Sequence, residues 1–346
     1  MSRLKATSST FHPPVRTLMG PGPSDVSPRV LAASSRPTIG HLDPLFVGLM
    51  DDVKGLLQFV FQTKNELTIP LSAPGSAGME AAFVNLLECG DKVIVCQNGV
   101  FGGRMKENVE RCGATAIMVM DRWGDPVDPE KLEAAIKEHP DAKVVAFVHA
   151  ETSTGVRSDA ETLCRLAKSA GMLVIMDAVT SLAGIDLQAD AWGADVVYSG
   201  TQKCLSGLPG ISPITFSNDA VATIQARKHT VQSWFLDMNL IMGYWGEGAK
   251  RSYHHTAPVN AVYALHDALL ILEEEGLNAS FVRHKANHLK LAAGLSKLGL
   301  EMAVAEEWRL PQLNSVLIPE GLDDALIRGR LLNEFDLAIG AGLGEL

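Results

Sequence analysis

The chain has 346 residues, of which 47% are hydrophobic and 20% are charged, and its formal net charge is −10. This balance predicts a packed globular core rather than a disordered chain, and the length favours one large domain plus a smaller one. A net negative charge without a long basic block argues against nucleic acids and anionic membranes as partners.

The apolar stretches and the cysteines predict a soluble, cytoplasmic protein. The longest apolar stretches, such as 172–176, are of strand length and fall well short of the roughly 20 residues that cross a bilayer. Residues 1–10 lack the apolar core of a secretory signal. The 5 cysteines never occur as Cys-x-x-Cys, which fits reduced thiols better than disulfides or a zinc site.

A polar N-terminal arm, residues 1–20, is expected to end at the Gly-Pro-Gly-Pro turn of 20–23. From about residue 66, apolar runs alternate with helical patterns. Continuous Val and Ile runs predict strands that are buried on both faces, and intervening helices predict a mainly parallel, doubly wound α/β sheet within a large domain, 21–275. The runs interpreted as the seven strands of this sheet are 68–71, 93–96, 116–120, 144–148, 173–176, 196–198 and 211–216.

The remaining residues, 276–346, are expected to form a smaller α+β domain. Long helical patterns cover 259–275 and 280–298. A strand candidate at 314–318 then precedes a helical pattern at 323–335. No internal repeat or low-complexity segment interrupts this order.

A glycine-rich turn at 72–80 is the first chemical candidate along the chain. It leads from a predicted strand straight into a predicted helix and contains Gly75, Ser76 and Ala77. Free N–H groups at such a helix start, together with the positive end of the helix dipole, favour a phosphate. Taken alone, an ordinary structural turn explains the pattern equally well.

Asp177 and Lys203 each follow a buried strand. Because open α/β sheets bind ligands at the carboxyl ends of their strands, both side chains are expected in one cleft. Pyridoxal phosphate enzymes need this pair: the lysine forms a Schiff base, and the aspartate keeps the pyridine nitrogen protonated. The alternatives are a helix cap for Asp177 and a solvated loop position for Lys203.

Two further side chains are candidates for the same cleft. Thr152 lies in the polar segment 149–155, which closes another predicted strand, and is a candidate hydrogen-bond partner of a pyridoxal phenolic oxygen. Phe101 follows the strand at 93–96 and is a candidate for stacking on the ring. An ordinary polar turn and core packing are the respective alternatives.

The paired histidines are not interpreted as metal ligands. His254 and His255 are neighbours, so their side chains are expected to point in different directions, and no acidic or cysteine partner lies at metal-ligand spacing. His284 and His288 share a helix face that we interpret as solvated. The sequence therefore predicts no metal site.

Taken together, the motifs resemble those of the class V aminotransferases of pyridoxal phosphate fold type I, and within them the alanine–glyoxylate and serine–pyruvate aminotransferases. The resemblance covers nearly everything from Leu18 to Leu346. It rests on Gly-Pro-Gly-Pro-Ser at 20–24, Arg-Pro-Thr-Ile-Gly-His-Leu-Asp at 36–43, Pro-Gly-Ser-Ala-Gly-Met-Glu-Ala-Ala at 74–82, His-Ala-Glu-Thr-Ser-Thr-Gly-Val at 149–156, Asp-Ala-Val-Thr-Ser at 177–181, Ser-Gly-Thr-Gln-Lys-Cys-Leu at 199–205 and Tyr-His-His-Thr-Ala-Pro-Val at 253–259.

The resemblance implies a ping-pong aminotransferase that binds pyridoxal phosphate in its large domain and moves an amino group from alanine or serine to a 2-oxo acid such as glyoxylate. It also implies an obligate homodimer, because some phosphate ligands come from the neighbouring subunit. The positions that it assigns are Lys203 to the Schiff base, Asp177 to the pyridinium, Phe101 to ring stacking, Thr152 to the phenolate, Gly75, Ser76 and Gln202 to the phosphate, and Tyr253 and Thr256 to the phosphate of the neighbouring subunit.

Two departures from the family pattern leave alternatives open. The phosphate turn reads Ala-Pro-Gly-Ser-Ala, where relatives often have a histidine after the glycine. Relatives also continue past the Gly-Leu-Gly element, here 342–344, into a strand whose arginine binds the substrate carboxylate. We therefore expect the working polypeptide to extend beyond Leu346 and the domain at 276–346 to be incomplete.

Other functions remain on the same scaffold. They are serine–glyoxylate or ureidoglycine–glyoxylate transamination, a desulfurase-like lyase, and a non-catalytic protein that binds pyridoxal phosphate. A desulfurase needs a mobile cysteine in a long loop, and Cys204 stands directly beside Lys203 instead.

Overall fold

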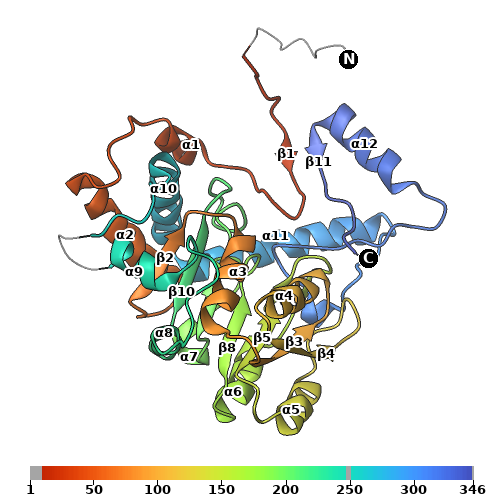
Figure 1. The fold of residues 1–346 in the computed structure, drawn as a ribbon. Coiled ribbons are helices and arrows are strands. Elements are labelled where there is room, and N and C mark those ends of the chain that lie inside the picture. The colour runs from red at the N-terminus through yellow and green to blue at the C-terminus, as the bar shows by residue number, and fades with distance from the viewer. Residues whose placement is uncertain (1–9, 247–250, 345–346) are drawn as a thin grey trace, which may run out of the picture.

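The computed structural model describes residues 10–246 and 251–344. A seven-stranded sheet with the order β2-β10-β9-β8-β5-β3-β4 forms its centre (Figure 1). Its strands are β2 (Leu67–Leu71), β3 (Lys92–Gln97), β4 (Thr115–Met120), β5 (Val144–Val148), β8 (Leu173–Asp177), β9 (Val196–Tyr198) and β10 (Ser212–Phe216). Strand β10 alone runs opposite to the other six strands. The predicted α/β fold with a mainly parallel seven-stranded sheet is confirmed, and every strand lies within one residue of its predicted ends.

Helices cover the sheet, which explains why its strands read as continuous apolar runs. Every residue of β2, β5 and β10 is buried. The covering and connecting helices are α3 (Gly75–Leu86), α4 (Val100–Arg111), α5 (Pro129–Glu138), α6 (Ala160–Ser169), α7 (Ala189–Trp192), α8 (Asn218–Gln225) and α9 (Met238–Trp245). Within the described ranges, no helix is long and apolar enough to cross a membrane.

The segment after the Gly-Pro-Gly-Pro turn is held against helix α10 (Val259–Glu275). Helices α1 (Pro28–Ser34) and α2 (Pro44–Phe61) both pack on α10. Arg29 and Arg36 pair with the same buried carboxylate, Asp267 of α10, at 3.0 and 2.7 Å. A buried carboxylate with two guanidinium partners fixes its surroundings, so these pairs anchor the chain just downstream of the turn.

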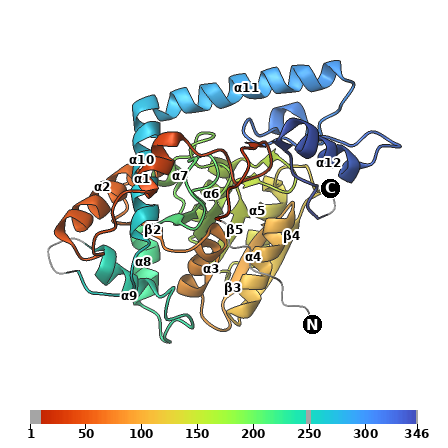
Figure 2. The ribbon, with the colours of Figure 1, turned by 90° about the horizontal axis from the view of Figure 1, so that it is seen from above.

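Helix α11 (Leu277–Lys297) follows α10 and runs along one side of the molecule toward α12 (Asp324–Phe335) (Figures 1 and 2). The helices predicted at 280–298 and 323–335 are therefore present. The strand predicted at 314–318 is wrong, because Val316 forms only an isolated bridge with Met302. Leu317 and Ile318 are 46% and 54% exposed, so this apolar run has no neighbouring strand in the described part of the chain to bury it.

Part of the predicted N-terminal arm is bound to the C-terminal region. Strand β1 (Thr17–Leu18) pairs in parallel with β11 (Leu337–Ala338). Next to this pairing, Arg16 forms an ion pair with Asp336. The strands β6 (Ala150–Glu151) and β7 (Val156–Arg157) form a separate antiparallel pair. The division into an arm, a large domain and a small domain at residues 20 and 275 stays a prediction.

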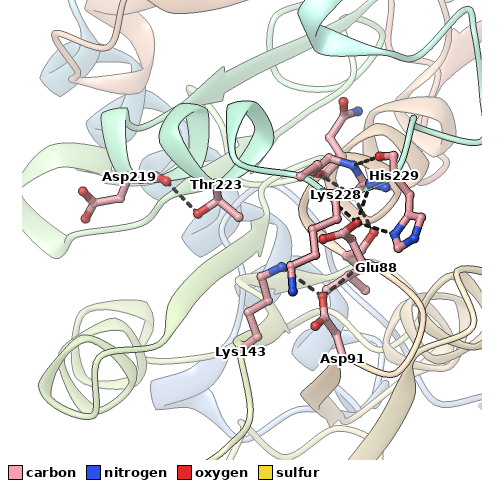
Figure 3. A network of polar contacts seen from close by, with 10 residues as sticks. Glu88, Asp91, Lys143, Asp219, Thr223, Lys228 and His229 are labelled. Carbon is pink, nitrogen blue, oxygen red and sulfur yellow. Dashed lines mark hydrogen bonds and ion pairs between the residues drawn. The ribbon is translucent and has the colours of Figure 1, made fainter.

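A polar network lies at the amino ends of the strands (Figure 3). Glu88 accepts hydrogen bonds from the main-chain N–H groups of Lys228 and His229 at 3.1 and 2.9 Å. Asp91, directly before β3, pairs with Lys143, directly before β5, at 2.9 Å. This network anchors the loop between α8 and α9 and leaves the carboxyl ends of the strands as the other edge of the sheet.

Candidate functional site

Asp177 is the last residue of β8 and is 2% exposed. Its carboxylate accepts hydrogen bonds from the N–H of Val179 at 2.8 Å and from the hydroxyl of Tyr198 at 2.9 Å. Tyr198 ends β9 and is the register partner of Asp177, so two parallel strands position this pair. Burial raises the pKa of Asp177 to about 7, although both donors favour the carboxylate.

Lys203 lies in the turn that follows β9. Its Nζ donates a hydrogen bond to the carbonyl oxygen of Pro21, which belongs to the Gly-Pro-Gly-Pro turn. The hydroxyl of Ser24 donates to the main-chain carbonyl of Lys203 at 2.9 Å. Burial lowers the pKa of Lys203, and Cys204 and Asp177 oppose this effect. A lysine with a lowered pKa has a larger neutral fraction, and the neutral amine is the nucleophilic form.

Helix α3 begins at Gly75 beside the end of β9. Strand β2 runs parallel to β9, since both are antiparallel to β10, and therefore delivers α3 to the same edge as Asp177. A Cβ on Gly75 would lie 3.3 Å from the carbonyl oxygen of Ser199, so a larger residue would crowd this approach. No described side chain caps the helix after Pro74. Uncapped N–H groups and the helix dipole favour an anion here, beside exposed Ser76 and half-buried Ala77.

Gln202 directly precedes Lys203. Its Oε1 is buried and, in the part of the chain that the structure describes, has no hydrogen-bond partner. The main-chain carbonyl of Gln202 accepts a hydrogen bond from the N–H of Ser24 at 2.9 Å. A flip of the amide exchanges its oxygen and nitrogen, so the unpartnered end of the side chain has the capacity to offer N–H groups to an anion.

Thr152 follows β6 and meets the turn that carries Asp177. Its Oγ1 lies 3.1 Å from Oγ1 of Thr180, and Thr180 donates to the carbonyl oxygen of Ala150 at 2.8 Å. Because Thr180 uses its proton for that carbonyl, the hydroxyl of Thr152 is the donor between the two threonines. The structure thus brings Thr152 and the Asp177 turn together.

Phe101 lies half-buried in the first turn of α4. The guanidinium carbon of Arg104 lies 4.7 Å from its ring centre. The main-chain N–H of Phe101 donates to Oε2 of Glu151 at 3.2 Å. Glu151 is fully buried and was not among the residues predicted from the sequence. The signal for it was present, because it stands directly before Thr152 at the end of a buried segment.

Tyr253 and Thr256 both lie exposed on the segment before α10, and Tyr253 is 62% exposed. The ring of Tyr253 has its centre 5.3 Å from that of His41. The two residues between them face the chain instead: His254 is buried and His255 is half-buried. In the described hydrogen-bond pattern, Tyr253 and Thr256 do not join the group around Asp177.

The expectation that His254 and His255 point in different directions is wrong, because their Nδ1 atoms lie 2.7 Å apart. Nε2 of His254 lies 3.4 Å from the carbonyl oxygen of Trp234, and Nε2 of His255 lies 2.7 Å from the hydroxyl of Ser72. The carbonyl only accepts, so a neutral His254 donates to it through Nε2 and accepts at Nδ1 from His255. Ser72 must then donate to His255. Burial lowers the pKa of His255 to about 4, which keeps it neutral.

The solvated position expected for His288 is also wrong. Its side chain packs into the body of the molecule, and the residue is only 9% exposed. His284, one turn earlier on α11, is half-buried, and burial lowers its pKa. Among the described residues, no group of three or more histidines, cysteines or acidic residues has the placement to hold a metal ion.

Comparison with known proteins places this geometry in a family. The sequence pattern of the aminotransferase class-V family matches residues 29–343. The chain is 37% identical to the alanine–glyoxylate aminotransferase of Rattus norvegicus over 98% of this chain and 82% of that protein. It is 35% identical to the (S)-ureidoglycine–glyoxylate transaminase of Bacillus subtilis over 96% of this chain and 84% of that protein. The crystal structure of the alanine–glyoxylate aminotransferase from Nostoc sp. matches with a TM-score of 0.96 and 43% identity, over 99% of this chain and 90% of that one.

Proposed function

The chain belongs to the class V aminotransferases, which depend on pyridoxal phosphate, and from that membership we propose that Lys203 and Asp177 are its catalytic residues. One observation carries the proposal: a buried carboxylate at the end of β8 and a lysine of lowered pKa in the turn after β9 lie at the carboxyl ends of two neighbouring strands. When bound, pyridoxal phosphate supplies an aldehyde that an amine can hold and a ring that accepts the electrons of a carbanion.

The residues around this pair fit the cofactor. The uncapped start of α3 offers the N–H groups of Gly75 and Ser76 to the phosphate, with Ala77 next to them, whose own N–H donates to the carbonyl oxygen of Pro74 at 2.8 Å. Beside Lys203, the amide oxygen of Gln202 lacks a partner among the described residues. We propose that Thr152 contacts the phenolic oxygen and that the ring of Phe101 stacks on the pyridine. The N–H groups at the start of α3 suit a phosphate, and the carboxylate of Asp177 suits a cationic ring nitrogen.

Asp177 and Lys203 would handle protons at two different places. A carboxylate that is already desolvated gains strongly from a cationic N–H, so Asp177 would hold the proton on the ring nitrogen and stabilise negative charge that develops in the ring. The depressed pKa of Lys203 suits it to remove a proton from the substrate α-carbon and to return it elsewhere.

We propose that the amino donor is alanine or serine and that the acceptor is a 2-oxo acid such as glyoxylate, in a ping-pong cycle. This rests on the names of the relatives, which include alanine–glyoxylate aminotransferases and a ureidoglycine–glyoxylate transaminase. The ureidoglycine reaction is the second candidate, because that relative matches almost as much of the chain.

The structure offers no support for a desulfurase-like reaction through Cys204. Burial raises the pKa of this thiol to about 12, so the reactive thiolate is scarce at neutral pH. The Sγ atom lies 3.6 Å from the carbonyl oxygen of Thr180, and a Cβ on Gly184 would lie 2.8 Å from it. This packing holds Cys204 in the turn, whereas a desulfurase cysteine has to move.

We also propose a homodimer in the cytoplasm with shared active sites, in which Tyr253 and Thr256 reach the phosphate of the partner subunit. The exposed position of both residues supports this proposal, as do the exposed apolar side chains Leu45 and Trp234, at 78% and 63%. All the cysteines among the described residues are free, which agrees with a reducing compartment.

A donor and acceptor panel tests the proposed function. The purified protein, loaded with pyridoxal phosphate, is assayed with alanine, serine or (S)-ureidoglycine as the donor and with glyoxylate, pyruvate or 2-oxoglutarate as the acceptor. We expect alanine or serine with glyoxylate to give the highest kcat/KM. A preference for ureidoglycine would select the second candidate, and no amino transfer from any donor would contradict the proposal.

A further inference from the structure

Glu151 is a carboxylate without a cationic hydrogen-bond partner in the described structure, yet it is fully buried. Its Oε1 accepts from the N–H and the hydroxyl of Ser153 at 3.0 and 2.6 Å. Its Oε2 accepts from the N–H of Phe101 at 3.2 Å. All three partners are donors, which matches an ionised carboxylate, although burial raises its pKa.

The segment before Phe101 is built to admit this carboxylate. A Cβ on Gly99 would overlap Cγ and Cδ of Glu151, so only glycine allows the start of α4 to approach so closely. The N–H of Val100 donates to the hydroxyl of Ser153 at 3.0 Å. Two consecutive N–H groups at the start of α4 therefore bind the Glu151–Ser153 pair.

A buried charge is an expensive way to hold a helix start. Asp and Glu are rarely fully buried without a partner, and a neutral side chain would satisfy a helix start at a lower desolvation cost. Glu151 connects two candidate residues of the site. It directly precedes Thr152 in the chain, and it accepts a hydrogen bond from the N–H of Phe101. Two segments that are far apart in the sequence thus share one carboxylate.

We propose that Glu151 is a positioning residue of the active site, which fixes the ring of Phe101 relative to Thr152 and so sets the orientation of the cofactor ring between them. The inference rests on the proposed roles of Phe101 and Thr152. Glu151 touches neither substrate nor cofactor in this account and acts through the main chain of α4 and through Ser153.

Glu151→Gln tests the proposal, because the amide keeps the size of the side chain and replaces one accepting oxygen with a donor. In either orientation of the amide, an N–H would face the N–H of Phe101 or that of Ser153. Asp195→Asn is the control for the loss of a buried carboxylate away from the site. Asp195 is 2% exposed, precedes β9 at the opposite edge of the sheet, and accepts from the N–H of Val174 at 2.8 Å and the hydroxyl of Ser217 at 2.7 Å; unlike Glu151, it also pairs with a lysine, Lys168, at 2.9 Å.

Three quantities are measured for the wild type and both variants: the Kd for pyridoxal phosphate by equilibrium dialysis, the visible circular dichroism of the bound cofactor, and the unfolding midpoint of the cofactor-free protein. We expect both variants to unfold more easily. Only Glu151→Gln should weaken cofactor binding, by about tenfold or more, and change the sign or strength of the dichroic band.

A purely structural role would give a different pattern. If Glu151→Gln binds the cofactor within about twofold of the wild type and keeps the dichroic band, the positioning role is overturned. Ser153→Ala serves if Glu151→Gln does not fold; it removes one donor to Glu151, and unchanged binding and dichroism would again overturn the role. Failure of the wild type itself to take up pyridoxal phosphate would contradict the proposed function instead.

Discussion

Asp177 accepts hydrogen bonds from Val179 and Tyr198, and burial raises its pKa from 3.8 to about 7. The folded chain therefore binds this proton more tightly than the unfolded chain does. By linkage, the contribution of Asp177 to stability is complete at pH values below about 4 and is lost as the pH rises toward 7. Desolvation of the ionised Asp177 carboxylate destabilises the cofactor-free protein near neutral pH, and a cationic partner would offset this effect.

Asp177→Asn is expected to relieve this cost in the cofactor-free protein. Asn still accepts from Val179 through its oxygen, and its amide group can donate to the hydroxyl of Tyr198, but it has no charge to desolvate. The free energy of unfolding of the variant, relative to the wild type, should rise between pH 4 and pH 7 by ~4 kcal/mol at most and then level off. Urea unfolding at several pH values measures this difference. A difference that does not change with pH would show that Asp177 is already ionised at low pH.

The same variant should lose activity, because a neutral amide cannot stabilise a protonated ring nitrogen. We expect a decrease of several orders of magnitude in kcat with bound cofactor still detectable by its absorbance. A decrease of less than about tenfold, or ~1.4 kcal/mol, would mean that another residue does this work.

Site residues could be predicted from the sequence where they stand at the end of a predicted strand. Asp177 and Lys203 stand at the ends of buried runs, so the fold class already places them at one edge of the sheet. Glu151 escaped notice because its partner is the main chain of Phe101, from another segment. The contact of His254 with His255 was predicted wrongly, because it depends on the local path of the main chain, which a residue pattern does not show.

Strands were predicted correctly from the sequence where both of their faces are buried. The runs at 144–148 and 196–198 coincide with β5 and β9, because strands covered on both faces have no polar side. The strand predicted at 314–318 is absent, because no described strand lies beside this apolar run to pair with it. Short pairings such as β1 with β11 carry no periodic signal in the sequence and could not be predicted.

The Gly-Pro-Gly-Pro turn contacts the side chain of Lys203. The carbonyl oxygen of Pro21 accepts the hydrogen bond of Nζ, and Gly22 has a φ of +116°. A Cβ on Gly22 would lie 2.6 Å from both Cδ and Nζ of Lys203. The turn therefore gives the lysine side chain its room only because position 22 has no side chain.

Gly22→Ala should lower the reactivity of the Lys203 amine, because the added Cβ would displace its side chain. Gly210→Ala is the control for backbone strain without this contact. Gly210 has a φ of +113°, almost the same as that of Gly22, but a Cβ there would meet nothing within 4 Å. Both variants should lose about 1 kcal/mol or more of unfolding free energy. Only Gly22→Ala should also slow the uptake of pyridoxal phosphate and lower the acylation rate of Lys203 in the cofactor-free protein, measured by mass spectrometry. Equal rates of cofactor uptake and of Lys203 acylation in the two variants would show that the turn does not control the reactivity of Lys203.

Tyr253 and Thr256 lie exposed on a segment that side-chain contacts hold to the rest of the chain. His254 and His255 lie between them and link Ser72, just before α3, to Trp234 in the loop anchored by the network of Figure 3. The segment proposed to serve the partner's phosphate is thus linked to the proposed phosphate turn of its own chain. The sequence alone could not show this link, because it joins three distant segments.

Mixed dimers test the shared active sites. Lys203→Ala subunits lack the amine and Tyr253→Ala subunits lack the residue that serves the partner, so each homodimer should be nearly inactive. In a mixed dimer, one site receives both intact residues, and random exchange should restore about one quarter of the wild-type activity. A mixture of Lys203→Ala with Asp177→Asn subunits is the control, because both changes affect the site of their own chain and should restore none. Activity of a verified monomer would also exclude the composite site.

Lys203 is proposed to hold the cofactor, and borohydride reduction tests this role. Reduction fixes pyridoxal phosphate covalently to whichever amine has bound its aldehyde. After proteolysis, mass spectrometry should find the cofactor on the peptide that contains Lys203, with none on the corresponding peptide of Lys203→Ala. An adduct on a different lysine, or an unmodified Lys203 in protein that shows full transaminase activity, would contradict this role of Lys203.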